Sequence, residues 1–350
     1  MELTPIRVRG KRRAPREELI AALPPKRLRR NPSRKKQAEV RRPKASNIES
    51  SMPLEVLERI FWLSENINFP RASLRIGRLL SGPSTLRETF LTAFGPTWDV
   101  WFGCVHGQRA GYPEIQSYAG WKDDAEQFGG NPSFQSDLLA CSWTTIDMIL
   151  DCWDIWVRRH AQKRLFEYIP LWGDPIRPNS YLGSGATVGI NNIKEAGHYF
   201  YHDYHAFRNV DRLSSDEEII EYGTERNSGT WIEVHRSTEI PDDLVTGPWG
   251  ESSLQKLFWL VRAGARLSPG QTWEVTREGF RNAMSDEYAP NLSVIRLLRI
   301  LGAFKDWPSH VRNEEFHSVK SAKPILSGDG DPALRAKYAY VGLLLISMSR

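Results

Sequence analysis

The densest group of side chains that could do chemistry is a set of three histidines spaced at four and three residues, His198, His202 and His205. On a helix these imidazoles share one face, a spacing compatible with a zinc site. On a strand His205 points away from the other two. The neighbouring aromatic residues favour a half-buried wall with hydrogen-bonded imidazoles, and no carboxylate completes an HExxH arrangement. We therefore expect no metal site.

Other catalytic signatures are missing from the sequence. The glycine-rich run Gly183–Gly189 lacks the Lys-Ser/Thr pair that holds phosphates and Mg²⁺. There is no GxSxG elbow, kinase motif set or dinucleotide fingerprint. Asp242 and Asp243 follow Pro241, so we expect them at a helix start rather than in a catalytic pair. The sequence predicts a protein that is not an enzyme, with no catalytic residues and no cofactor.

The positive charge is concentrated at one end of the chain. Residues 1–46 carry 16 Lys and Arg against 4 Asp and Glu, a net charge of +12, whereas the remaining residues carry 31 against 38, a net charge of −7. Few large apolar residues and six prolines predict a disordered tail, because little surface is available to offset the ordering entropy. A basic cluster within the tail predicts binding to a nuclear import receptor: Lys26, Arg27, Arg29 and Arg30. The alternative is a general polycation that binds nucleic acid or anionic lipid by counterion release.

Cysteine content and hydropathy predict the compartment. Cys104, Cys141 and Cys152 are too few for a disulfide framework and lie in apolar surroundings, so we expect buried thiols in a reducing environment. Charges interrupt the N-terminus before any apolar stretch develops, so we expect no secretory signal. The most apolar stretch, residues 338–348, is too short to span a bilayer. We expect a protein of the nucleus, with the cytoplasm as a second location, and without a membrane partner.

Helical patterning begins at residue 52, where apolar residues recur at three- and four-residue steps: Leu54, Leu57, Ile60, Phe61 and Leu63. Further short helices are expected over residues 72–80 and 85–94, each followed by Gly-Pro. A helix pair is expected over residues 134–168. Residues 173–235 are the least regular, and residues 230–235 alternate like a strand.

The C-terminal half shows a weak repeat. Residues 257–265 and 295–303 both end in Leu-x-x-x-Gly-Ala, with the two glycines 38 residues apart. This ending resembles the second helix of ankyrin repeats, although the spacing exceeds the usual period and the Thr-Pro-Leu-His turn is absent. Each unit would bury its apolar face only against the next. The alternative is an irregular helical bundle.

Residues 52–61 read Met-Pro-x-Glu-Val-Leu-x-x-Ile-Phe. This order resembles the start of an F-box, Leu-Pro-x-Glu-(Ile/Leu/Val)-Leu-x-x-Ile-Phe, with Met in place of the first Leu. Residues 52–94 are also similar to the divergent F-box of a group of filamentous-fungal, Pezizomycotina-type proteins, as is the segment 239–249 followed by 258–265. Where the family usually ends in Cys-(Lys/Arg)-x-Trp, this chain has Ile-Gly-Arg-Leu-Leu at residues 76–80.

The resemblance implies a substrate adaptor of an SCF-type ubiquitin ligase, in which an F-box-like head docks on the Skp-family adaptor of a cullin-RING ligase. The body would bind a client protein. The resemblance implies these adaptor-binding residues: Pro53, Leu54, Leu57, Ile60 and Phe61. Periodicity alone also permits these residues to face the chain's own core. The rival function is a nuclear nucleic-acid or chromatin-associated protein that acts through its basic tail.

The expected fold is mainly α, with a small three-helix F-box-like head, an irregular or ankyrin-like helical body and a minor β element. The expected domains are a disordered tail over residues 1–46, the F-box-like domain over residues 47–98 and the client-recognition region over residues 99–350.

Overall fold

The computed structural model describes residues 51–102, 129–161, 164, 195–213, 232–285, 289–325 and 331–347. The chain divides into two units, Met1–Pro53 and Leu54–Arg350, and every helix described below belongs to the second. The predicted basic tail and its import cluster lie outside the described residues.

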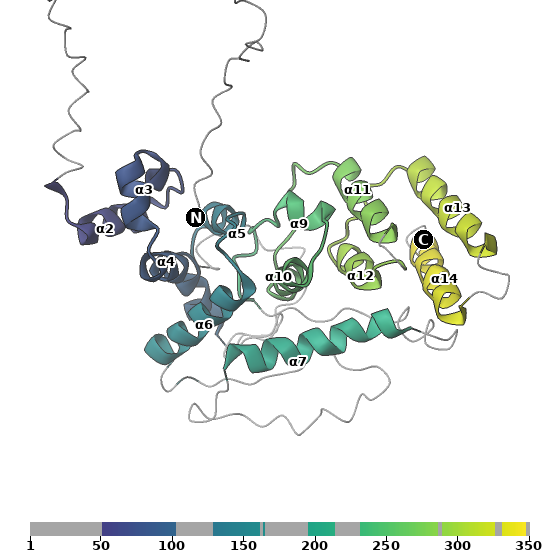
Figure 1. Ribbon diagram of the computed structural model, residues 1–350, viewed down its shortest axis with the longest axis horizontal. Coiled ribbons are helices and arrows are strands. Elements are labelled where there is room, and N and C mark those ends of the chain that lie inside the picture. The colour runs from purple at the N-terminus through teal and green to yellow at the C-terminus, as the bar shows by residue number, and fades with distance from the viewer. Residues whose placement is uncertain are drawn as a thin grey trace, which may run out of the picture. The chain divides into compact units, whose positions relative to one another are not determined.

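The described part of the chain is mainly helical, as predicted (Figure 1). The helices in chain order are α2 (Leu54–Ser64), the 3-10 helix η1 (Phe69–Arg71), α3 (Leu74–Leu80), α4 (Pro83–Trp101), α5 (Pro132–Leu139), α6 (Ile146–His160), α7 (Ala196–Arg208), the 3-10 helix η5 (Asn209–Arg212), α9 (Asp242–Thr246), α10 (Glu251–Arg262), α11 (Trp273–Met284), α12 (Leu292–Ile300), α13 (Ser309–Ile325) and α14 (Pro332–Ser347). Within these described residues, β pairing is limited to an isolated parallel bridge between Glu239 and Arg266. The strand predicted over residues 230–235 is not formed by its described part, residues 232–235.

Helices α2, α3 and α4 form a small packed group with η1. α2 contacts both α3 and α4, and η1 contacts α3. Ser73 caps α3 by accepting a hydrogen bond from the Ile76 backbone N–H at 3.2 Å. Gly77 allows α3 to approach η1, because a Cβ at this position would lie 2.8 Å from the Pro70 carbonyl oxygen. Helices are therefore present at all three positions expected between residues 52 and 94.

Helix α4 is longer than predicted. The sequence predicts a helix over residues 85–94 that stops at Gly95-Pro96, but α4 continues through both residues to Trp101. Gly95 lies beside Trp156, where an added Cβ would be in contact with the indole ring at 3.4 Å. The expected domain boundary at residue 98 thus falls within a helix.

Burial explains why the proline does not end α4. Phe90, Phe94 and Trp98 recur at four-residue steps and are fully or almost fully buried. Trp98 packs edge-to-face on Trp156 of α6, with ring centroids 6.0 Å apart. An interior proline costs about 3 kcal/mol, whereas each buried aromatic side chain contributes roughly 1.5–3 kcal/mol. Trp98 and Trp101 lie beyond the proline and are buried, so their burial offsets its cost. Phe90, Phe94 and Trp98 join α4 to the core cluster that continues to α14.

The C-terminal helices stack in pairs. Figure 1 shows α9 with α10, α11 with α12, and α13 with α14 in succession. Contacts run within each pair and also between pairs: α9 contacts α11, α10 contacts α12, and α12 contacts α14. Each second helix is therefore covered by the next, the arrangement in which a repeat buries its apolar face only against its neighbour.

The repeated Gly-Ala ending terminates two of these second helices in the same way. Gly264 and Gly302 adopt φ angles of +91° and +71°, in the left-handed region that favours glycine. The N–H of the following alanine returns to the carbonyl oxygen of Leu260 at 2.9 Å and of Leu298 at 3.0 Å. A hydrogen bond from a backbone N–H to the carbonyl oxygen five residues earlier is characteristic of the Schellman motif at a helix end. The two segments are therefore similar in structure as well as in sequence.

A buried glutamine amide connects α4, α5 and the segment before α9. Gln135 of α5 is fully buried. Its Nε2 donates to the Ala93 carbonyl oxygen and to the Thr97 hydroxyl, both at 2.9 Å. Its Oε1 accepts from the His235 backbone N–H and from the Thr238 hydroxyl, both at 2.8 Å. All four hydrogen-bonding positions of the amide are occupied.

Gln135→Leu should lower the free energy of unfolding by at least about 3 kcal/mol, because it leaves several buried groups without their partner and each costs roughly 1–3 kcal/mol. The midpoint of urea unfolding, followed by tryptophan fluorescence, measures this loss. Gln255→Leu is the control, since the Gln255 amide bonds only at the surface, to Glu251. Equal midpoints for the two variants would contradict the role assigned to Gln135.

Gly279→Ala should also destabilise the protein. A Cβ at residue 279 of α11 would lie 2.2 Å from the Val245 carbonyl oxygen at the end of α9. Relieving that overlap costs about 1–3 kcal/mol or more, which exceeds the gain of about 1 kcal/mol from alanine's helix propensity. Gly270→Ala is the control, because its nearest neighbour is 3.9 Å away. A urea midpoint for Gly279→Ala at or above that of the control would refute the close approach of α9 and α11.

Candidate protein-interaction site

Helix α2 carries apolar residues on two faces, one buried and one largely exposed. On the inner face, Leu57 and Phe61 are only 2% and 3% exposed. The Phe61 ring stacks on Phe69 with centroids 6.4 Å apart and meets Phe134 of α5 edge-on at 6.3 Å. These two residues therefore belong to the chain's own core.

The outer face of α2 is formed by Val56, Ile60 and Leu63, which follow each other at four and three residues and so lie on one side of the helix. Val56 is 42% exposed and Leu63 is 85% exposed, whereas Ile60 is half-buried. We call these three residues the outer row. A surface helix is expected to carry polar residues on its solvent face, so an apolar row there favours a partner surface.

Three side-chain hydrogen bonds fix which face of α2 points outward. Trp62 Nε1 donates to the Thr89 hydroxyl at 3.0 Å, and the Thr85 hydroxyl donates to Glu58 Oε1 at 2.6 Å. At the end of the helix, Asn131 Nδ2 donates to Glu65 Oε2 at 2.6 Å. Two of these bonds reach α4 and one reaches the residue that caps α5. Together they hold the outer row at the surface.

The structure divides the residues that the F-box resemblance implies for adaptor binding: Pro53, Leu54, Leu57, Ile60 and Phe61. Leu54 and Pro53 are exposed, Ile60 is half-buried, and the other two are buried. Their assignment to adaptor binding stays a prediction. Leu63 was expected on the same face as Leu57, but six residues place the two side chains about 120° apart around the helix, and Leu63 is exposed whereas Leu57 is buried. Val56 was not among the residues expected to bind the adaptor. Its spacing of four and seven residues from Ile60 and Leu63 places it on their side of the helix and could have identified it.

The histidine group lies on helix α7, where His198 and His205 are exposed and His202 is half-buried. Among the described residues, no three His, Cys, Asp or Glu side chains are placed to hold a metal ion. The adjacent Asp203 is fully buried and bonds to Arg262 Nε at 2.7 Å.

Two of the three cysteines are buried, as predicted, whereas Cys104 lies outside the described residues. Burial raises the pKa of the Cys152 thiol to about 12 and also raises the pKa of Cys141. A thiol that stays protonated at neutral pH is a poor nucleophile.

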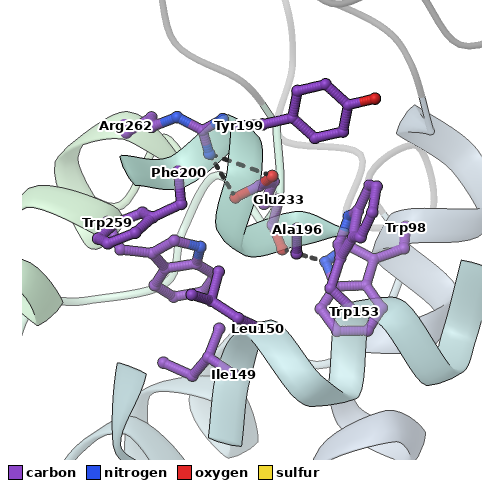
Figure 2. Close-up of a pocket in the computed structure, with 10 residues that line it drawn as sticks. All are labelled: Trp98, Ile149, Leu150, Trp153, Ala196, Tyr199, Phe200, Glu233, Trp259 and Arg262. Carbon is purple, nitrogen blue, oxygen red and sulfur yellow. Dashed lines mark hydrogen bonds and ion pairs between the residues drawn. The ribbon is translucent and has the colours of Figure 1, made fainter. Parts of the chain in front are cut away.

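A small cavity lies between α4, α6, α7 and α10 (Figure 2). Its walls include Trp98, Trp153, Trp259, Glu233 and Arg262. Burial raises the pKa of the Glu233 carboxyl, against the opposing effect of Arg262. The cavity measures about 20 Å³, far below the few hundred Å³ of typical small-molecule sites. It is therefore too small for a substrate of ordinary metabolite size.

The chain matches no protein-family model, no curated protein and no solved structure. Among the described helices, none is both long and apolar enough to cross a bilayer. The geometry of α2 and the residue order of its sequence are therefore the features that bear on function.

Leu57→Ala and Leu63→Ala should differ sharply in stability although both truncate a leucine of the same helix. Removing the buried Leu57 side chain should cost about 2–5 kcal/mol, whereas the exposed Leu63 should change the free energy of unfolding by less than about 0.5 kcal/mol. Urea unfolding of the two variants measures the difference. Equal losses would contradict the assignment of the inner and outer faces of α2.

Proposed function

We propose that this chain is a substrate adaptor of an SCF-type ubiquitin ligase, in which the α2–α4 group docks on a Skp-family adaptor and the helical body binds a client protein. The observation that carries the proposal is the outer row of α2, placed within the residue order that resembles an F-box. The role is one of binding, without catalytic residues or a cofactor.

The outer row has the chemistry of a docking surface. Apolar side chains that a partner removes from water contribute to binding through the hydrophobic effect. Full burial of each such side chain contributes roughly 1.5–3 kcal/mol, so covering Val56, Ile60 and Leu63 supplies several kcal/mol before any polar contact forms. An adaptor that offers an apolar helical groove fits this row.

The stacked helix pairs support the second half of the proposal. Helix stacks present extended surfaces that bind other proteins, and the pairs from α9 to α14 form such a stack. The client is proposed to bind there. The basic cluster Lys26, Arg27, Arg29 and Arg30 is proposed to bring the protein into the nucleus through an import receptor.

The alternative function is binding of nucleic acid or chromatin through residues 1–46. The net charge of +12 on that segment favours it, because basic segments bind phosphate backbones by counterion release. In that case the outer row of α2 plays no part in recruitment, and a substitution in α2 leaves all partners unchanged.

Co-purification of a Skp-family adaptor with the full-length chain tests the proposal. The variant Val56→Asp/Leu63→Asp should reduce the recovered adaptor at least tenfold, because two charges would be buried at the interface. Both residues are exposed in the free chain, so the fold should remain intact. Leu57→Asp would not discriminate, since it places a charge in the core.

Leu343→Asp is the matched control, because Leu343 of α14 is an exposed leucine, 48% accessible, outside the α2–α4 group. It should leave adaptor recovery unchanged, and circular dichroism should show equal helicity for all variants. Equal recovery of adaptor with the wild type and the α2 variant, or no recovery with either, would overturn the proposed function.

A further inference from the structure

The charged residues of α2, η1 and α3 are sorted between the two sides of this small group. Residues 54–80 contain four arginines and three glutamates, and all four arginines are exposed. Glu58 and Glu65 are half-buried and bond inward, to side chains of α4 and of the residue that caps α5. The surface of the group therefore carries mainly positive charge, whereas the chain beyond residue 46 has a net charge of −7.

Two of these arginines lie beside exposed leucines. Arg59 is three residues from Val56 and four from Leu63, so it lies on the same side of α2 as the outer row. On α3, Arg78 follows Leu74 by four residues, and Leu74 is 70% exposed. Each of the two helices thus presents exposed apolar side chains next to a guanidinium.

The charge of these two guanidiniums is not already matched within the chain. Among the described residues, neither Arg59 nor Arg78 forms an ion pair with a carboxylate. Glu55, the exposed glutamate of residues 54–80, lies one turn before Arg59 but is not paired with it. A guanidinium presents its donors in a planar fork, which fits a carboxylate through two parallel hydrogen bonds. Both side chains are therefore available to carboxylates of a partner.

The exposed leucines favour a protein partner over other polyanions. A nucleic-acid backbone would bind the arginines but leave Leu63 and Leu74 in water. A helix that lies in a bilayer surface buries a broad apolar face, whereas the exposed face of α3 has Leu74 beside two arginines, Arg75 and Arg78. Protein interfaces combine an apolar centre with a polar rim and are enriched in arginine, which matches both helices.

We propose that the partner surface that covers the outer row is acidic, with carboxylates beside its apolar groove that bind Arg59 and Arg78. This inference rests on the proposed function, because it specifies the chemistry of the adaptor surface on which α2 and α3 dock. Exposed charges at the rim of an interface act mainly on the rate of association, by steering the two proteins together. The two arginines would therefore speed docking, while the outer row would slow dissociation.

The kinetics of association between the full-length chain and a purified Skp-family adaptor, followed by biolayer interferometry, test the inference. Arg59→Glu/Arg78→Glu should lower the association rate constant about tenfold at low salt and change the dissociation rate constant less. The difference from the wild type should shrink when sodium chloride is raised from about 50 mM to about 0.5 M, because salt screens charges at the surface. Arg59→Lys/Arg78→Lys keeps both charges and should associate at nearly the wild-type rate.

Lys320→Glu/Arg335→Glu is the matched control, because it reverses two exposed cations of α13 and α14 and changes the net charge of the chain by the same amount. It should associate like the wild type. Equal association rates for the two glutamate variants, with normal binding by the wild type, would overturn this inference and leave the proposed function standing. Failure of the wild type to bind the adaptor would overturn both. Loss of binding to phosphatidylserine vesicles by Arg59→Glu/Arg78→Glu, with adaptor kinetics unchanged, would assign the arginines to a lipid surface and also overturn the inference.

Discussion

The buried amide of Gln135 is the interaction on which the arrangement of the chain depends. It joins residues 93 and 97 of α4 to residues 235 and 238, segments more than a hundred residues apart in sequence. A buried amide is stabilising only when all of its hydrogen-bonding groups are satisfied. The Trp98 indole adds a parallel link by donating to the Glu233 carbonyl oxygen at 2.9 Å. Polar bonds therefore specify how α4 meets the segment that leads into the stacked pairs, while apolar burial supplies most of the stability.

The faces of α2 illustrate what sequence periodicity can and cannot decide. Helical spacing is found both in the buried pair, Leu57 and Phe61, and in the outer row. The pattern therefore predicts the helix but not which of its faces points toward the core. The inner face is selected by Phe69 and Phe134, which stack on Phe61. Phe134 lies far along the chain, so the spacing of apolar residues within 52–66 cannot reveal its contact with Phe61. For the same reason, the residues taken from the family motif include both buried and exposed positions.

Predictions from local sequence were correct where the backbone conformation requires a particular residue. They were wrong where packing against residues distant in sequence determines the structure. Gly264 and Gly302 end their helices as predicted, because a positive φ angle needs glycine. Gly95-Pro96 was read as a helix end, yet α4 continues, because the burial of Trp98 and Trp101 beyond the proline offsets its cost. Helix α7 lies in the stretch called least regular, although Tyr199, Asp203 and Phe207 already recur at helical spacing. The cavity could not be predicted, since its walls come from four helices and one connecting segment.

The continuity of α4 bears directly on the proposed function. In that proposal α2 docks on the ligase and the stacked pairs hold the client, so the connection between them determines where the client stands. A flexible linker would spread the client over many positions and lower its effective concentration at the ligase. Here α4 runs unbroken from its contact with α2 to Trp98 and Trp101, and its side chains share one buried core cluster with α10. Helix α2 and the body are thus parts of one packed unit, and the hydrogen bonds of Gln135 connect α4 and α5 to the segment that leads into the body.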